Sequence, residues 1–78
     1  FPFAIFVNRS MSINELKSTI ETKIKINKKY GIKSLNIHAI GTDNIQKIKT
    51  ALVDLKGLLS EEPEIDSGRN YIIVTIWF

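Results

Sequence analysis

The sequence predicts a small α/β domain, a two-layer sandwich in which three strands alternate with two helices in the order β-α-β-α-β. Runs of β-branched and aromatic residues lie at both ends of the chain, two stretches carry apolar residues at helical spacing, and a strand-like alternation separates them. Helical crossovers imply parallel pairing of the first two strands through a right-handed connection. The 78 residues suffice for one domain, residues 1–78, with a three-stranded mixed or parallel sheet.

The first strand is expected over residues 3–7, and a turn follows it. Ser12 and Glu15 have the spacing of a capping box, in which each side chain accepts a hydrogen bond from the other residue's backbone N–H. The helix that begins there is expected to reach about Tyr30, with Gly31 as its C-terminal stop. Its apolar stripe consists of Ile13, Leu16, Ile20 and Ile24.

The second strand is expected over residues 34–40, where apolar and polar residues alternate, and Gly41 ends it. Asp43 is placed to cap the second helix. Apolar residues at helical spacing carry that helix to an end near Gly57 or Ser60.

The C-terminal quarter divides into an acidic stretch and a hydrophobic one. Residues 61–68 contain four acidic side chains, a proline and a glycine, which predicts a solvated loop. Residues 71–78 predict a strand with apolar residues on both faces. Such a strand is expected to lie inside the sheet or under a partner.

Composition limits the classes of protein that the chain can belong to. There is no cysteine, which excludes disulfides and thiolate metal sites and favours an intracellular, reducing compartment, cytoplasm and mitochondrion alike. No apolar run approaches the roughly 18 residues of a membrane helix, and the apolar start is too short for a signal peptide, so no membrane association is expected.

Chemistry-bearing motifs are scarce, so we expect a protein that is not an enzyme and has no cofactor or metal. His38 is the only histidine, and a half-exposed strand residue is the favoured interpretation of it. The acidic residues 61–66 lack the ligand spacing and the glycine of a calcium loop. Gly41 and the residues after it lack the second glycine and the lysine of a phosphate-binding P-loop.

The lysines are the main functional signal. Residues 13–33 hold six lysines against two glutamates, although the net charge of the chain is only +3. Flexible cations along one surface can contact phosphates, and a solvated helix face is the equally weighted alternative. Tyr30, Tyr71 and Trp77 can stack on bases, or can equally be core or interface residues. The cations considered for phosphate contact are Arg9, Lys17, Lys25, Lys28 and Lys29.

Three segments resemble the Alba superfamily of small nucleic-acid-binding proteins: the basic loop and helix start at residues 9–16, the glycine–strand–glycine segment at residues 31–41, and Gly57. The resemblance covers most of residues 3–60 and implies an Alba-like fold. It further implies that the loop after the first strand and the start of the second helix face nucleic acid. At the position of the family's third strand we expect only the acidic loop. The residues that the resemblance nominates are Arg9, Ser10, Gly41, Thr42 and Asn44.

A second resemblance concerns residues 29–35, which with the following strand and Gly41 look like the eleventh small-subunit ribosomal protein family. That resemblance implies contact with ribosomal RNA. We therefore expect a non-catalytic nucleic-acid-binding module, RNA favoured over DNA, within a ribonucleoprotein or chromatin-like assembly. The alternative is a structural protein–protein interaction subunit of a large complex, which includes a divergent ribosomal small-subunit protein. Protein partners are expected through the last strand or in a dimer.

Overall fold

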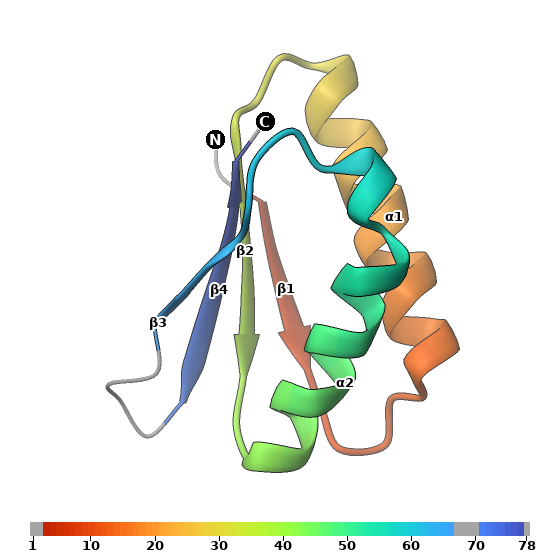
Figure 1. Ribbon diagram of the computed structural model, residues 1–78, viewed down its shortest axis with the longest axis vertical. Coiled ribbons are helices and arrows are strands. Elements are labelled where there is room, and N and C mark those ends of the chain that lie inside the picture. The colour runs from red at the N-terminus through yellow and green to blue at the C-terminus, as the bar shows by residue number, and fades with distance from the viewer. Residues whose placement is uncertain (1–2, 67–70, 78) are drawn as a thin grey trace.

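The computed structural model describes residues 3–66 and 71–77, and of Thr42 it describes the backbone alone. Two expectations, Gly68 in the acidic loop and Phe78 in the last strand, lie outside these residues. The chain forms a sheet with two helices packed on one face (Figure 1). In order, the elements are β1 (Phe3–Val7), α1 (Ile13–Lys29), β2 (Ser34–Ala39), α2 (Thr42–Asp54), the short 3₁₀ helix η1 (Lys56–Leu58), β3 (Glu64–Asp66) and β4 (Ile72–Trp77).

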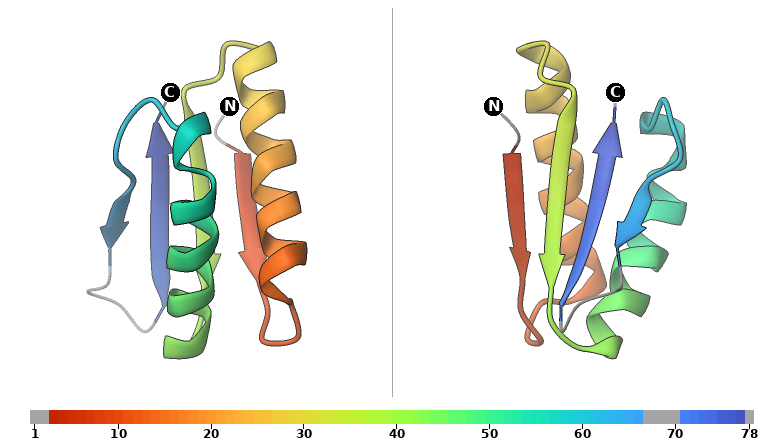
Figure 2. Two further views of the ribbon diagram at one scale, coloured as in Figure 1. Left: turned by 45° about the vertical axis from the view of Figure 1, so that its right-hand side comes forward. Right: turned by 90° about the vertical axis from the view of Figure 1, so that its left-hand side faces the viewer.

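The sheet is mixed and has the strand order β1-β2-β4-β3, which the right-hand view of Figure 2 shows from the open side of the sheet. The predicted α/β class and the parallel pairing of β1 with β2 are confirmed. The predicted strand count is wrong, because the sheet contains four strands rather than three. β4 pairs antiparallel with both β2 and β3.

The extra strand, β3, lies in the stretch expected to be a loop. Its three residues are all exposed in the structure. The sequence therefore lacks the alternation of apolar and polar residues by which a half-buried strand is recognised. They form a strand through backbone pairing with β4, in which Glu64 lies opposite Thr75 and Asp66 opposite Ile73. A non-local ladder of this kind stabilises even residues with low strand propensity.

The ends of α1 follow the sequence closely. The capping box is present: the Glu15 N–H donates to Ser12 Oγ at 3.1 Å, and the Ser12 N–H donates to Glu15 Oε2 at 3.4 Å. The helix ends at Lys29, one residue before the expected Tyr30. The N–H of Ile32 then donates to the Asn27 carbonyl at 2.9 Å, across the left-handed Gly31, in a Schellman motif.

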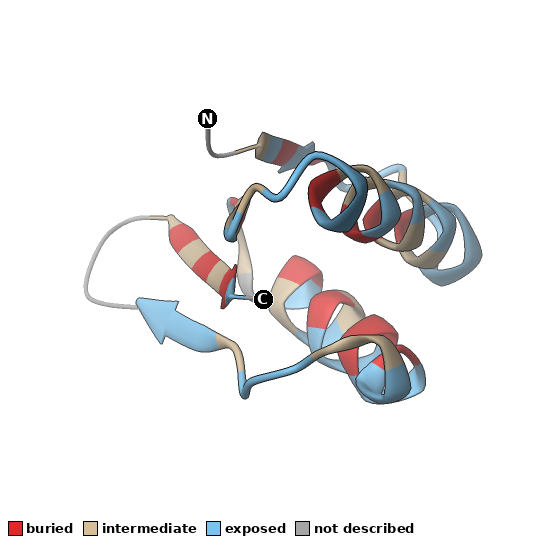
Figure 3. Cartoon of the chain, turned by 90° about the horizontal axis from the view of Figure 1, so that it is seen from above, coloured by how far each residue is buried: buried red, intermediate tan, exposed pale blue. Residues whose placement is uncertain are grey.

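The core lies between the helices and the sheet, so the sheet has one covered face and one open face (Figure 3). Leu16, Ile20 and Ile24 of α1 are fully buried against Leu35 and Ile37 of β2 and the other core residues. The covered face therefore fixes the positions of both helices, and with them the turns at each end of the sheet.

Two further expectations concern the cap of α2 and the position of β4. The N-cap of α2 is Gly41 and not Asp43, which lies inside the first helical turn. β4 is an inner strand, so the alternative of a central position is confirmed. β2 pairs with β4 along residues 72–77, and β3 pairs with it at residues 73–75, so the outermost strands of the sheet are β1 and β3.

Candidate nucleic-acid interface

The clearest anion-binding geometry lies where the parallel strands β1 and β2 end together. The turn at residues 8–11 follows β1, and Gly41 with the first turn of α2 follows β2; we call residues 8–11 and 41–44 the arginine end. A Cβ atom placed on Gly41 would lie 3.5 Å from Arg9 Nη2 and 3.7 Å from Arg9 Nε. The exposed guanidinium therefore lies directly over the start of α2.

The start of α2 has backbone donors without a side-chain cap. Gly41, at φ 93°, is the N-cap and supplies no side-chain hydrogen bond. The first turn of a helix exposes free N–H groups and carries the equivalent of about half a positive charge. Asp43 brings one exposed carboxylate to this turn, yet no ion pair to Arg9 is seen among the described residues.

Lys47 holds the arginine end together, and the sequence alone did not identify it. Its ammonium donates to the Arg9 carbonyl at 3.0 Å and to the Met11 carbonyl at 2.8 Å. The turn is also tightened by Asn8, whose Oδ1 accepts from the Ser10 N–H at 3.1 Å and from the Ser10 hydroxyl at 2.6 Å. The nominated Ser10 is exposed here, but its hydroxyl proton is already used.

Of the nominated residues at the start of α2, Asn44 requires a correction. Its side chain is only 1% exposed and points inward, where Nδ2 donates to the Ile40 carbonyl at 2.6 Å. That bond satisfies the last carbonyl before the helix, so Asn44 shapes the turn and does not face a surface ligand. Thr42 is the first residue of α2, and its side chain lies outside the described part of the structure.

The predicted lysines gather at the opposite end of α1. We call Lys25, Lys28 and Lys29 the lysine end. The 17 residues of α1 span about 25 Å, so the two ends are far apart. Lys25 Nζ pairs with Glu21 Oε1 at 3.1 Å, Lys28 Nζ donates to the Leu58 carbonyl at 2.6 Å, and Lys29 Nζ lies 5.7 Å from the Tyr30 ring centroid.

Lys17 belongs to neither end. Its ammonium lies 3.5 Å from Asp54 Oδ2 and so links α1 to α2. Both side chains are more than one-third exposed, which makes the bond weak and leaves the lysine partly accessible. The structure thus divides the nine nominated residues into a group of five at the arginine end, three lysines at the lysine end, and Lys17 between them.

The open face of the sheet carries an aromatic pair that the sequence did not single out. The rings of Phe6 in β1 and His38 in β2 stack with their centroids 5.3 Å apart and their planes 29° from parallel, and Phe6 is 76% exposed. A cavity of about 300 Å³ lies beside this pair. We call it the aromatic pocket; its lining residues are Phe6, Val7, His38, Ala39, Ile40 and Tyr71.

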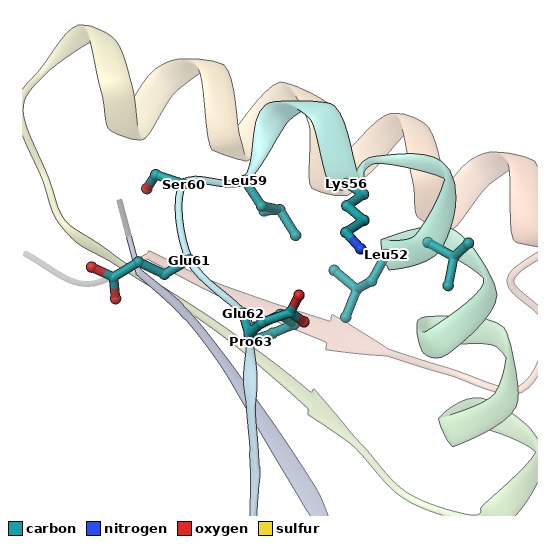
Figure 4. Close-up of a pocket in the computed structure, with 8 residues that line it drawn as sticks. Leu52, Lys56, Leu59, Ser60, Glu61, Glu62 and Pro63 are labelled. Atoms are coloured by element: carbon teal, nitrogen blue, oxygen red, sulfur yellow. The ribbon is translucent and has the colours of Figure 1, made fainter.

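A second cavity, of about 340 Å³, lies between the end of α2 and the chain that leads into β3. Its apolar wall includes Leu52 and Leu59, and its rim carries Lys56, Glu61 and Glu62. Figure 4 shows the Glu61 carboxylate pointing away from those leucines. Because the carboxylates on the rim outnumber the ammonium, this cavity is the less suitable of the two for a polyanion.

Among residues 3–66 and 71–77, no three histidine, aspartate or glutamate side chains come together to hold a metal ion. No helix in the same residues is both long and apolar enough to cross a membrane. Comparison of the chain with protein-family models, with curated proteins and with solved structures found no match in any of the three.

Proposed function

We propose that the protein is a non-catalytic nucleic-acid-binding module, RNA favoured over DNA, that acts in a ribonucleoprotein or chromatin-like assembly. The observation that carries the proposal is the position of Arg9 over the uncapped start of α2. A guanidinium beside free helix N–H groups concentrates positive potential where a phosphate can accept hydrogen bonds from both.

The electrostatics of this end favour a ligand over a purely structural role. A cation at a helix N-terminus is repelled by the helix dipole, so Arg9 gains nothing from its position in the free protein. A bound phosphate turns the same arrangement into an attraction. Lys47 already bonds the carbonyls of the Arg9 turn, which reduces the ordering that binding must impose.

Contacts of this kind recognise the sugar-phosphate backbone and not the base sequence. RNA is favoured because its 2′-hydroxyl adds a donor and an acceptor beside each phosphate. The Alba superfamily, which the sequence resembles, has a strand at the position of β3, and here β3 pairs antiparallel with β4.

The proposal is tested by reversing one charge at each end of the molecule. Arg9→Glu and Lys33→Glu each lower the net charge by two, and both residues are exposed, but Lys33 lies in the turn between α1 and β2. We expect Arg9→Glu to weaken binding of a labelled RNA decamer by about tenfold or more, since hydrogen bonds to charged groups contribute about 1.5–3 kcal/mol. We expect Lys33→Glu to weaken it less than threefold.

A salt titration completes the test. If lysine and arginine side chains neutralise phosphates, the affinity of the wild-type protein falls as salt is added. In a plot of the logarithm of the binding constant against the logarithm of the salt concentration, each phosphate contact with a single strand contributes about −0.7 to the slope. Equal effects of the two variants would place the binding elsewhere. Absence of RNA and DNA binding at low salt would refute the proposal.

A structural protein-binding subunit is the second candidate, and the edge strand β1 favours it. β1 pairs only with β2 among the described strands and exposes Phe6, which suits strand addition by a second copy or another protein. Light scattering across a range of protein concentrations separates the candidates. Stable self-association that persists in high salt, without nucleic-acid binding, would favour this one.

A further inference from the structure

We propose that the aromatic pocket on the open face of the sheet stacks an unpaired base, so that the preferred ligand is single-stranded nucleic acid. This inference rests on the proposed function and specifies which form of nucleic acid the same site takes. Three observations support it: an exposed ring pair, its continuity with the arginine end, and the arrangement of charges on the open face.

The ring pair has the geometry of a stacking surface. Phe6 stacks on His38, and its 76% exposure leaves much of its surface to solvent. An exposed phenylalanine contributes little to the fold, whereas an aromatic ring in a strand offers every base a π-face to stack on. The neighbouring cavity of about 300 Å³ adds walls from Ile40 and Tyr71.

The pocket runs directly into the proposed phosphate contact. Val7 and Ile40 line the pocket, and they are followed in the chain by the Arg9 turn and by Gly41. Successive Cα atoms are only about 3.8 Å apart, so the pocket and the start of α2 adjoin. One nucleotide can therefore place its base against Phe6 and its phosphate at Arg9.

The charges on the open face indicate which path a bound nucleic-acid strand takes across the sheet. Glu64 and Asp66 lie opposite Thr75 and Ile73, on the open side of the outermost strand β3. The Glu64 carboxylate repels phosphates from that edge. The bound nucleic-acid strand is therefore expected to follow β1 and β2, past the arginine end, rather than to cross the whole sheet.

Base pairing separates single-stranded from double-stranded ligands here. Bases in a duplex are stacked within the helix and present only their edges to a protein, so the Phe6 ring has no face to contact. An unpaired base can stack on the ring, and removal of an aromatic residue that stacks a base lowers affinity roughly 5- to 150-fold.

The experiment uses three probes with the full chain: an adenine RNA decamer, a decamer of abasic ribose phosphates that carries the same charge, and an RNA duplex of ten base pairs. The duplex has about twice the charge density and so is favoured if phosphate contacts alone decide binding. We expect the adenine decamer to bind at least fivefold more tightly than the abasic strand or the duplex. Phe6→Ala should remove this preference, and Phe6→Tyr should retain it. Val53→Ala is the matched control, because Val53 is a similarly exposed apolar residue, 71% exposed, on α2.

The outcomes distinguish this inference from the proposed function. Equal binding of the three probes, with Phe6→Ala silent, overturns base stacking and leaves phosphate binding intact. Failure of all three probes to bind overturns both. If Phe6→Ala instead abolishes self-association without changing RNA affinity, the open face is a protein interface and the stacking inference is wrong. Should Phe6→Ala not fold, Phe6→Leu keeps a large apolar side chain, removes the ring and gives the same readout.

Discussion

The arginine end and the lysine end are built from the same parts. Each turn has a glycine with positive φ, Gly41 at 93° and Gly31 at 71°. Each also has a buried asparagine whose amide donates to a backbone carbonyl, Asn44 to Ile40 at 2.6 Å and Asn27 to Ser34 at 3.0 Å. Each end also carries cations. What differs is helix polarity, since α2 begins at the first end and α1 finishes at the second.

Because of that difference, the helix dipole attracts the cations at one end and repels the cation at the other. Lysines in the last turn of α1 are attracted by the negative end of its dipole, and Lys25 and Lys28 have further partners in Glu21 and Leu58. These lysines therefore have favourable electrostatic contacts within the fold. Arg9 lies at the positive end of α2 without an ion pair in the described residues, and this is why we propose an anionic ligand there.

The largest expected effect comes from removing what the two ends share, the α1 core that holds them apart. Ile20 is fully buried near the middle of α1. Ile20→Ala should lower the free energy of unfolding by about 2–5 kcal/mol, because it leaves a cavity. Urea denaturation measures this, with Val53→Ala as an exposed control expected to change it by less than about 0.5 kcal/mol. A loss below about 1 kcal/mol would mean that the core repacks.

The two positive-φ glycines, one at each end, allow the same substitution to be compared at the lysine end and the arginine end. Gly31→Ala should cost about 1–2 kcal/mol of unfolding free energy, and Gly41→Ala about 1–3 kcal/mol, because both backbones are strained for a side chain. Only Gly41→Ala should also weaken RNA binding, since it distorts the turn under Arg9. Equal loss of affinity in both variants would show that binding follows stability and not location.

The lysine end is tested by ligand length. Neutralising all three lysines together, as Lys25→Gln, Lys28→Gln and Lys29→Gln, should leave the affinity for an RNA trimer within about twofold. A trimer at the arginine end is too short to reach lysines about 25 Å away. A strand of about fifteen nucleotides can reach them, and its salt slope should fall by up to about 2. A large loss with the trimer would relocate the site to the lysine end.

Sequence reasoning succeeded where the signal is local. The capping box of Ser12 and Glu15, the glycine stop at Gly31 and the parallel pairing of β1 with β2 each follow from neighbouring residues or from one connection rule. β3 was missed because its pairing with β4, rather than its own three exposed residues, makes it a strand.

The candidate site was predicted in part for the same reason. The sequence nominated Arg9 and Gly41 separately, but 32 positions separate them and only the fold brings them together. Asn44 was misassigned because an amide after a glycine looks the same in sequence whether it points outward or inward. Phe6 was read as part of a strand, and its exposure depends on which face the helices cover.

The smallest expected effect concerns Lys47. Its substitution tests whether the turn that carries Arg9 must be ordered before RNA binds. Lys47→Met keeps most of the length of the side chain but removes the bonds to the Arg9 and Met11 carbonyls. Because the turn then has to be ordered during binding, RNA affinity should fall about two- to fivefold, with a stability loss of about 0.5–1.5 kcal/mol. Lys49→Met removes the same charge from an exposed position two residues further along α2, so it controls for net charge alone. If the two variants bind RNA equally, Lys47 acts only through its charge, and the arginine end does not need to be held in place to bind.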